Sequence, residues 1–298
     1  MGLRANPSQR QRRLGAELRR LRLDGGLTAT AAGKEFGFSA AHVNNIEAGR
    51  TAIAPARLRA LAELYGCKDE RLIDALIAMS QSNGRGWWSE FRHPPHSDEA
   101  CDLAELEEMS VRHRSFQWIH IPGLLQTEEY MRALFRGGQP DLPEESIERF
   151  VRFRMRRQRL LVEARAPELH AVVHEAALRM EFVGREVMRR QIEHLMRQAT
   201  RLPHVRLQIL PFRAEAYPPS FSCPFVCYDA AVPELSTVYI DHPTLSSFVI
   251  DQPSLVQFSD AFTRLSSVAL PPVEAEAEVS SPARRDSFGL MQRLLYEL

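Results

Sequence analysis

The sequence predicts a mainly α-helical protein in two parts, a five-helix domain followed by a larger α+β domain with a small sheet. Apolar residues recur at helical spacing through the first 80 residues, and three strand-like runs occur after residue 200. A Gly- and Pro-rich stretch separates the two regions. With 298 residues, 44% of them hydrophobic, the chain is long enough for two domains that each bury a core.

The N-terminal region contains five short segments with helix start and stop signals. Thr28 and Ser39 are suited to cap the second and third helices, and Pro55 suits the first turn of the fourth. The glycines of "DGG" and Gly37 end the first two helices. We expect helices over residues 8–22, 28–37, 39–47, 55–65 and 69–80.

A domain boundary is expected in "QSNGRGWWSEFRHPPHSDEA", where Gly and Pro pairs interrupt the helical pattern. Residues 1–82 form the first domain in this interpretation, 83–98 form the linker, and 99–298 form the second domain. Trp87 and Trp88 are unusual in a free linker, so we expect them to dock it onto one of the domains.

The second region alternates between helical and strand-like patterns. An acidic helix over 102–116 is followed by a strand-like piece that ends at Pro122-Gly123 and by a helix from Thr127. Residues 168–179 begin as a strand and turn helical near Glu175. We expect further helices over 144–164, 184–203, 253–268 and 285–297, strands within 205–212, 221–229 and 236–241, and a flexible link over 271–284.

Several function classes lack their sequence signals. There is no P-loop, GxGxxG or GxSxG motif, so we expect no enzyme activity and no cofactor. The four cysteines, Cys67, Cys101, Cys223 and Cys227, have no neighbours at zinc-ligand spacing, so we expect buried thiols rather than a metal site. No apolar run approaches the roughly 18–20 residues of a membrane span, and the N-terminus lacks a secretory signal, so we expect a cytoplasmic protein.

The net charge of zero hides an asymmetry. Residues 1–68 carry twelve Lys and Arg against five Asp and Glu, a surplus of seven positive charges that the rest of the chain balances. A basic N-terminal module on an acidic body indicates a polyanionic partner for the module.

The stretch "LTATAAGKEFGFSAAHVNNIEAGRTAIAPARLRALAELYGC" resembles the XRE-type helix-turn-helix of phage repressors. The matching features are the Leu27-Thr28 entry, the turn residue Gly37, the apolar Val43 and Ile46, and the "IEAGR" that follows the recognition helix. The resemblance implies that the helix over about 39–47 lies in the DNA major groove with its N-terminal outer positions facing the bases. It therefore implies that double-stranded DNA is a partner.

Carried over position by position, the resemblance gives a set of DNA-contacting residues. The base-facing candidates are Ala40, Ala41, His42 and Asn44, on a helix that Ser39 caps. Asn45 and Arg50 are candidates for contacts with the DNA backbone or a base edge. Thr28 is expected to contact phosphate, helped by Arg10, Arg13 or Arg57. An alanine methyl can pack on the thymine methyl and Asn can pair with adenine, so we expect few hydrogen-bonded bases and strong salt dependence. Two departures from the family are Ala29, where Gln is frequent, and Gly33, where Ala is frequent and glycine weakens the helix by up to about 1 kcal/mol.

Beyond residue 86 the chain resembles the C-terminal region of the WhiJ-like regulators of actinobacteria, which is described as antitoxin-like. The residues that carry this resemblance are Trp87-Trp88, "IPGLLQTEEY", "RMRRQ", "HEAALR", "VMRRQIEHL", "VRLQILPF" and "VYID". It implies a transcriptional regulator that is often encoded beside a small partner protein, with no established enzyme activity. Tyr217, where His is common, and Asp241, where Glu is usual, depart from the family pattern.

The expected helix over 144–164 carries polar residues in line with its apolar stripe. Arg154 and Gln158 continue the row of Ile147, Phe150 and Val151. In one interpretation Arg154 snorkels or pairs with a buried acid such as Glu175. In the other, Arg154, Arg157 and Gln158 line a pocket for an anionic ligand or a partner's acidic segment. Glu175 is a further candidate for this pocket, as are Gln126 and Trp118 near the Pro-Gly turn.

The sequence thus predicts a DNA-binding, nucleoid-associated transcriptional regulator. In this hypothesis it binds an operator as a homodimer, and the C-terminal domain dimerises and senses a small protein partner or a ligand. The alternative is an antitoxin-like protein that sequesters a small partner protein and binds DNA only to regulate its own synthesis.

Overall fold

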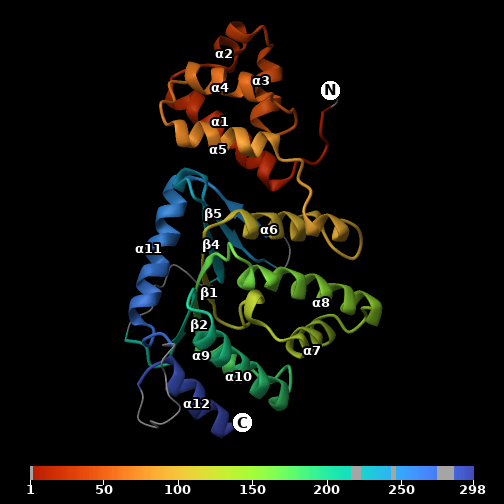
Figure 1. Ribbon diagram of the computed structural model, residues 1–298, viewed down its shortest axis with the longest axis vertical. Coiled ribbons are helices and arrows are strands. Elements are labelled where there is room, and N and C mark those ends of the chain that lie inside the picture. Colours follow the sequence, from red (N-terminus) through yellow and green to blue (C-terminus); the bar gives the residue numbers. More distant parts are fainter. Residues whose placement is uncertain (1–2, 216–222, 243–245, 274–284) are drawn as a thin grey trace. The chain divides into compact units, whose positions relative to one another are not determined.

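The structure is a computed structural model of the chain that describes residues 3–215, 223–242, 246–273 and 285–298 (Figure 1). The chain divides into two compact units. Unit 1 comprises Met1–Leu106 together with Ala231–Leu235, and unit 2 comprises Glu107–Ala230 together with Ser236–Leu298. The fold class predicted from the sequence, a helical N-terminal part followed by an α+β part with a sheet, is confirmed.

Unit 1 is helical among its described residues. Four helices begin at the polar side chains Ser8, Thr28, Ser39 and Asp69, each of which accepts a hydrogen bond from a backbone N–H of the first turn. The five expected N-terminal helices are confirmed. The helices of this region are α1 (Gln9–Asp24), α2 (Ala29–Phe36), α3 (Ala40–Glu47), α4 (Pro55–Leu64), α5 (Glu70–Gln81), the short 3-10 helix η1 (Trp87–Phe91) and α6 (Asp98–Met109).

The division between the units falls within α6, between Leu106 and Glu107. The first half of α6 belongs to unit 1 because its acids bind α1. The backbone N–H of Gln9 donates to Asp102 at 2.7 Å, and Arg10 pairs with Glu105 at 2.8 Å. Sequence patterns placed the second domain from residue 99, because such side-chain pairings over long distances leave no local signal. The limits 1–82, 83–98 and 99–298 stay a prediction.

Unit 2 is built on one mixed sheet of six strands. Three strands, β1 (Arg112–Gln117), β2 (Glu168–His174) and β3 (Val205–Leu210), run parallel; β4 (Phe225–Asp229), β5 (Thr237–Ile240) and β6 (Ser247–Val249) continue antiparallel. The strand order is β3-β2-β1-β4-β5-β6, so β1 lies at the centre and pairs with both halves. The helices of unit 2 are α7 (Glu128–Gly138), α8 (Glu144–Gln158), α9 (Glu175–Arg179), α10 (Arg185–Arg201), α11 (Gln252–Val268) and α12 (Ser287–Glu297). Two 3-10 turns, η2 (Gly123–Leu125) and η3 (Arg159–Val162), lie between them. A third 3-10 turn, η4 (Pro233–Leu235), belongs to unit 1.

Helices cover the two faces of the sheet unequally. On β2, the alternate residues Leu169, Ala171 and Val173 face a core shared with α10 and α12, whereas Val172 faces a second core with α11. Figure 1 shows α11 alone on its side of the sheet, with α7, α8 and α10 on the other. The cavity of unit 2 is lined by residues of β1, β4 and β5 and by residues of η2, α7 and α8.

Three sequence predictions for unit 2 are wrong: the acidic helix, the long helix, and the strand-like piece before Pro122-Gly123, of which only Gln117 lies in a strand. The acidic helix expected over 102–116 ends at Met109, and 112–117 form the central strand β1. Acidic helix formers before Met109 masked the change to an alternating pattern after it. The short edge strand β6 was missed, because three residues carry too little pattern. The long helix expected over 144–164 ends at Gln158 and continues as η3.

The expected flexible link over 271–284 lies mostly outside the described residues, as does Tyr217. Its described beginning is bound to the sheet. The backbone N–H of Leu270 donates to Ile209 at 2.9 Å, and that of Val273 donates to Leu207 at 3.0 Å. Val273 is also buried in the core of α10 and α12. The described first residues, up to 273, therefore belong to the packed fold.

Candidate functional site

Two consecutive helices of unit 1, α2 and α3, meet at a tight turn. Gly37 ends α2 with φ of 66°, a conformation that glycine adopts without strain. The Ser39 hydroxyl then accepts a hydrogen bond from His42 N–H at 3.2 Å and starts α3. A Cβ on Gly33 would lie 2.6 Å from the carbonyl oxygen of Phe38, so glycine lets α2 approach the turn. The departure from the family noted at Gly33 is therefore a packing requirement.

The inner face of α3 is fixed to α1. Val43 and Ile46 are buried, and Arg22 donates two hydrogen bonds to the Glu47 carboxylate, at 2.6 and 2.8 Å. Both side chains of this ion pair are buried. Because a bidentate Arg–carboxylate pair is directional, it sets the rotation of α3 about its own axis as well as its position.

The rotation of α3 leaves its other face open to solvent. Ala41 and Asn44 are exposed, and Ala40, His42 and Asn45 are half-buried. The His42 ring packs on Phe38 with 4.4 Å between ring centroids, which limits its freedom to reach a base. The outer face of α3 therefore offers one small apolar group, Ala41, and one amide, Asn44, in exposed positions.

Most arginines of unit 1 are neutralised inside the unit. Arg13 pairs with Glu17 at 3.2 Å, and its guanidinium also donates to the carbonyl oxygen of Glu234. The side chain of Arg13 is only 5% exposed, and burial lowers its pKa against the opposing attraction of Glu17. Arg10 is likewise buried against Glu105. Both side chains are buried against acids of unit 1, so the structure gives no support to the phosphate contacts predicted for Arg10 and Arg13, which stay a prediction.

Two arginines beside α3 remain accessible to solvent. Arg50 and Arg57 are exposed, and neither forms an ion pair with any residue that the structure describes. The Arg57 guanidinium lies over the Phe38 ring at 5.1 Å, which holds it next to the turn between α2 and α3. Thr28 is exposed at the N-terminus of α2 and caps it through Ala31 N–H at 3.1 Å. These cations and the two helix N-termini suit the binding of phosphate groups.

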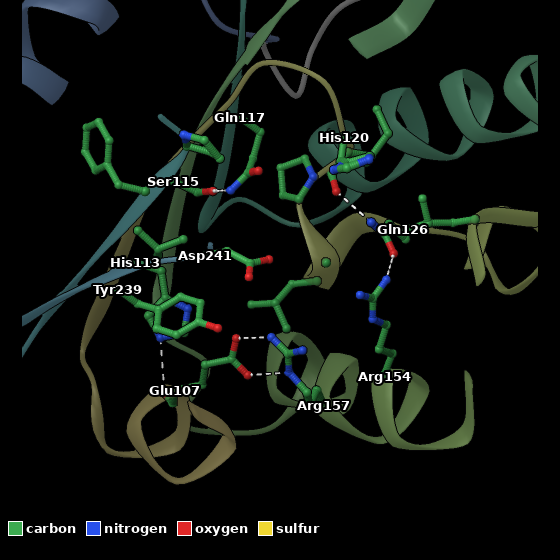
Figure 2. Close-up of a pocket in the computed structure, with 18 of the residues that line it drawn as sticks. Glu107, His113, Ser115, Gln117, His120, Gln126, Arg154, Arg157, Tyr239 and Asp241 are labelled. Carbon is green, nitrogen blue, oxygen red and sulfur yellow. Dashed lines mark hydrogen bonds and ion pairs between the residues drawn. The ribbon is translucent and has the colours of Figure 1, made fainter. Parts of the chain in front are cut away.

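Unit 2 contains a cavity of about 390 Å³ on the face of the sheet opposite α11 (Figure 2). Alternate residues of three neighbouring strands line it, because successive strand residues point to opposite faces. β1 contributes His113, Ser115 and Gln117; β4 contributes Val226 and Tyr228; β5 contributes Tyr239, and Asp241 follows that strand. The turn after β1, η2, α7 and α8 supply the other wall, with Gln126, Phe135, Arg154 and Arg157 among its residues.

One end of the cavity is a closed network around Glu107. Arg157 donates to its carboxylate at 2.8 Å from Nε and 2.6 Å from Nη2, and the Tyr228 hydroxyl donates at 3.2 Å. Burial alone would lower the pKa of Arg157, but the attraction and hydrogen bonds of Glu107 raise it. Burial and then Glu107 raise the pKa of Tyr228 well above its usual value. Arg157 is therefore a satisfied structural cation.

His113 belongs to the same network. Its Nε2 lies 3.0 Å from the backbone carbonyl oxygen of Glu107, and its ring packs edge-on against Tyr228. The side chain is 1% exposed, and burial lowers its pKa. Nδ1 has no hydrogen-bond partner in the part of the chain that the structure describes. His113 is thus held as a neutral ring that donates through Nε2.

Arg154 on α8 differs from Arg157. Its Nη1 donates to the Gln126 side-chain oxygen at 2.8 Å, and the guanidinium lies over the Phe135 ring at 4.5 Å. No described carboxylate pairs with it. Burial, followed by repulsion from Arg157, lowers the pKa of Arg154 to about 10, which leaves it charged at neutral pH. Figure 2 shows its side chain on the helical wall beside Gln126.

Three expected pocket residues lie elsewhere. Glu175 pairs with Arg179 at 2.7 Å and accepts the Phe212 N–H, so the expected pair with Arg154 is wrong. Gln158 does not line the cavity but donates to the carbonyl oxygens of Gly123 and Gln126, at 3.0 and 2.7 Å, and so fixes the η2 turn. Trp118 is 39% exposed and does not line the cavity either.

Sequence reasoning missed the strand side of the cavity. His113, Ser115 and Gln117 alternate with Arg112, Arg114 and Phe116 in "RHRSFQ", a period-two pattern. That pattern would have placed three polar side chains on one face of a strand. Reading the segment as the end of a helix hid it.

No group of three or more His, Cys, Asp or Glu side chains among the described residues could hold a metal ion. No described helix is long and apolar enough to cross a membrane.

Comparison with known protein families gives two matches. Residues 13–76 match a helix-turn-helix domain, the region of α1 to α5, which indicates a DNA-binding regulator. Residues 100–280 match the family described as Domain of unknown function (DUF5753), which covers most of unit 2. No curated protein and no solved structure gave a significant match. Because the second match spans more than half of the chain, this protein belongs to the DUF5753 family, with a helix-turn-helix domain at its N-terminal side.

Proposed function

We propose that this protein is a sequence-specific transcription regulator of the XRE type, in which α3 enters the major groove of double-stranded DNA. The observation that carries the proposal is the open face of α3. Ala41 and Asn44 are exposed on it, and beside it lie Arg50 and Arg57, which pair with no described acid. The other face is fixed by the buried pair of Arg22 and Glu47. A rigid small helix face flanked by open cations is what groove reading requires.

The exposed residues define how the helix reads DNA. Asn44 can make a bidentate contact with adenine, and the Ala41 methyl can pack on a thymine methyl. One bidentate contact gives about 1–3 kcal/mol of discrimination, too little for a specific operator, so phosphate contacts and a second half-site supply the rest. We therefore propose that the regulator acts as a homodimer on a two-fold symmetric site, at the nucleoid.

In this proposal, unit 2 receives the regulatory signal. A cavity with an unpaired cation is a feature of a ligand-responsive domain rather than of a rigid dimerisation support. The resemblance to WhiJ-like regulators in several segments of this unit supports the same role, with a small protein partner as another source of the signal. Sensing by unit 2 follows from these features, whereas dimerisation by unit 2 is proposed only because the DNA site needs a second half-site.

A double variant tests the groove assignment. Asn44→Ala together with Arg50→Ala removes one base contact and one phosphate contact from exposed positions, so the fold should persist. In mobility-shift assays with DNA from upstream of its own gene, at about 150 mM salt, near physiological ionic strength, we expect the shift to be lost.

The matched control is Arg71→Ala, which removes an exposed positive charge from α5 of the same unit. It should leave the shift within about two-fold, because Arg71 lies on α5 rather than on the reading helix and already pairs with Asp69 at 3.8 Å. Unchanged affinity of the double variant would show that α3 does not read the groove.

A further inference from the structure

The cavity of unit 2 contains two opposite charges that do not pair with each other. Arg154 lies on its helical wall and Asp241 follows β5 on its strand wall, and no ion pair joins them. Figure 2 shows the Asp241 carboxylate and the Arg154 guanidinium on separate sides of the space, with Tyr239 and His113 beyond Asp241. Because the other two charges, Arg157 and Glu107, neutralise each other, the cavity has one open positive group and one open negative group.

The guanidinium of Arg154 is held in place with donors to spare. Only Nη1 forms a hydrogen bond with a described residue, the side-chain oxygen of Gln126. The amide of Gln126 is itself fixed, because its Nε2 donates to the Ile121 carbonyl oxygen at 2.8 Å and Gln158 binds its backbone carbonyl. The Phe135 ring supports the guanidinium plane at 4.5 Å. The remaining N–H groups suit an oxyanion that approaches in the plane.

Asp241 is the complementary acceptor. Among the described residues, its carboxylate accepts a hydrogen bond only from the Ser246 hydroxyl, at 3.3 Å. Asp241 is exposed to solvent, and a carboxylate on a cavity wall favours a ligand group that donates hydrogen bonds and carries positive charge.

The rest of the cavity sets the size and polarity of the ligand. Its volume of about 390 Å³ falls in the range of small-molecule sites, roughly 300–1,000 Å³. Leu124, Leu134, Phe135 and Phe225 give the cavity apolar walls. A phosphate monoester fits poorly, because a dianion would face one open cation and the carboxylate of Asp241.

We propose that unit 2 binds a small zwitterion of the α-amino-acid type, with its carboxylate on Arg154, its ammonium group on Asp241 and its apolar side chain against the apolar walls of the cavity. The signalling consequence of this site, a change in DNA binding, rests on the regulator function proposed above. The binding site itself does not.

Binding of four related probes to the full chain tests the proposal by isothermal titration calorimetry. The probes are phenylalanine, 3-phenylpropionate, which lacks the ammonium group, phenethylamine, which lacks the carboxylate, and phenyl phosphate. We expect phenylalanine to bind about ten-fold more tightly than any of the others, since each lost charged contact removes about one factor of ten. The proposal would be overturned if all four probes bound equally well, or if no probe bound at concentrations up to about 10 mM.

Variants assign the two ends of the site. Arg154→Met should weaken phenylalanine binding about ten-fold or more, Arg154→Lys should keep part of it, and Asp241→Asn should erase the preference for phenylalanine over 3-phenylpropionate. Arg152→Met, an exposed position of α8 outside the cavity, is the matched control and should bind as the unaltered chain does. If Arg154→Lys and Asp241→Asn fold normally by circular dichroism and bind phenylalanine unchanged, the assignment is wrong.

Mobility-shift assays with and without phenylalanine separate this proposal from the regulator function. Probe binding with a change in the DNA shift supports both. Probe binding by a chain that shifts no DNA supports the site and contradicts the regulator function. A DNA shift without probe binding supports the regulator function and contradicts the site.

Discussion

At the scale of the residue, the partners of the arginines decide what each arginine does. Arg10, Arg13 and Arg22 look alike in the basic sequence of α1, yet each is buried against an acid of unit 1. Arg50 and Arg57 have no such partner among the described residues and stay open to solvent. The same division recurs in unit 2, where Arg157 is neutralised by Glu107 and Arg154 is not. Basic composition therefore overstates the number of cations that can meet a ligand.

Gly33 shows how packing overrides helix propensity at one position. Alanine is preferred to glycine inside a helix by about 1 kcal/mol, so Gly33→Ala would stabilise an isolated α2. In the folded unit the new Cβ would lie 2.6 Å from the Phe38 carbonyl oxygen. We expect Gly33→Ala to lower the free energy of unfolding by about 1–3 kcal/mol, measured by urea denaturation.

Gly137 in α7 is the matched control, because a Cβ there would meet nothing within 4 Å. Gly137→Ala should leave stability unchanged or raise it by up to about 1 kcal/mol. A stabilising effect at Gly33 as large as that at Gly137 would contradict the close approach of α2 to the turn.

At the scale of the element, capping side chains determine where the helices of unit 1 begin. Thr28, Ser39 and Asp69 each accept a backbone N–H of the first turn of α2, α3 and α5. These hydrogen bonds span two or three residues, so sequence reasoning located them directly. In β1 the opposite happened, because the acidic run that ends at Met109 favoured helix and concealed the alternation of the strand after it.

The caps predict which substitutions separate stability from DNA binding. Ser39→Ala and Asp69→Ala should each cost about 1 kcal/mol of unfolding free energy, because each removes one helix cap. Only Ser39→Ala should also weaken the shift of operator DNA, since Ser39 starts the reading helix whereas Asp69 starts α5.

Thermal melts and mobility shifts of the two variants, with unaltered protein as reference, provide the measurement. Equal losses of DNA affinity in both variants would mean that the effect comes from global instability rather than from α3.

At the scale of the whole molecule, burial of histidines links stability to pH. Burial lowers the pKa of His113, His120, His170, His174 and His194 below the ordinary value of 6.5. The folded protein therefore binds fewer protons than the unfolded chain just below pH 6.5, and stability falls as the pH falls through that window. Each histidine changes the free energy of unfolding by at most about 1.4 kcal/mol per pH unit.

Urea unfolding at pH 7.5 and at pH 5.5, followed by circular dichroism, measures this dependence. We expect a lower free energy of unfolding at pH 5.5, and a smaller difference between the two values in His113→Phe, which has no titrating ring. Stability that rises on acidification would contradict the neutral buried state of His113.

The sequence by itself determined the helix-turn-helix, because caps, a turn glycine and apolar residues three or four positions apart are local signals. It also identified Arg154 and Gln126 as unusual. Only the tertiary structure decided what those residues do. Arg157 meets an acid 50 residues away, and Gln126 meets Arg154 across 28 residues. Such distant pairs decide which arginine is neutralised by an acid and which stays without an acidic partner, and they cannot be inferred from the local sequence.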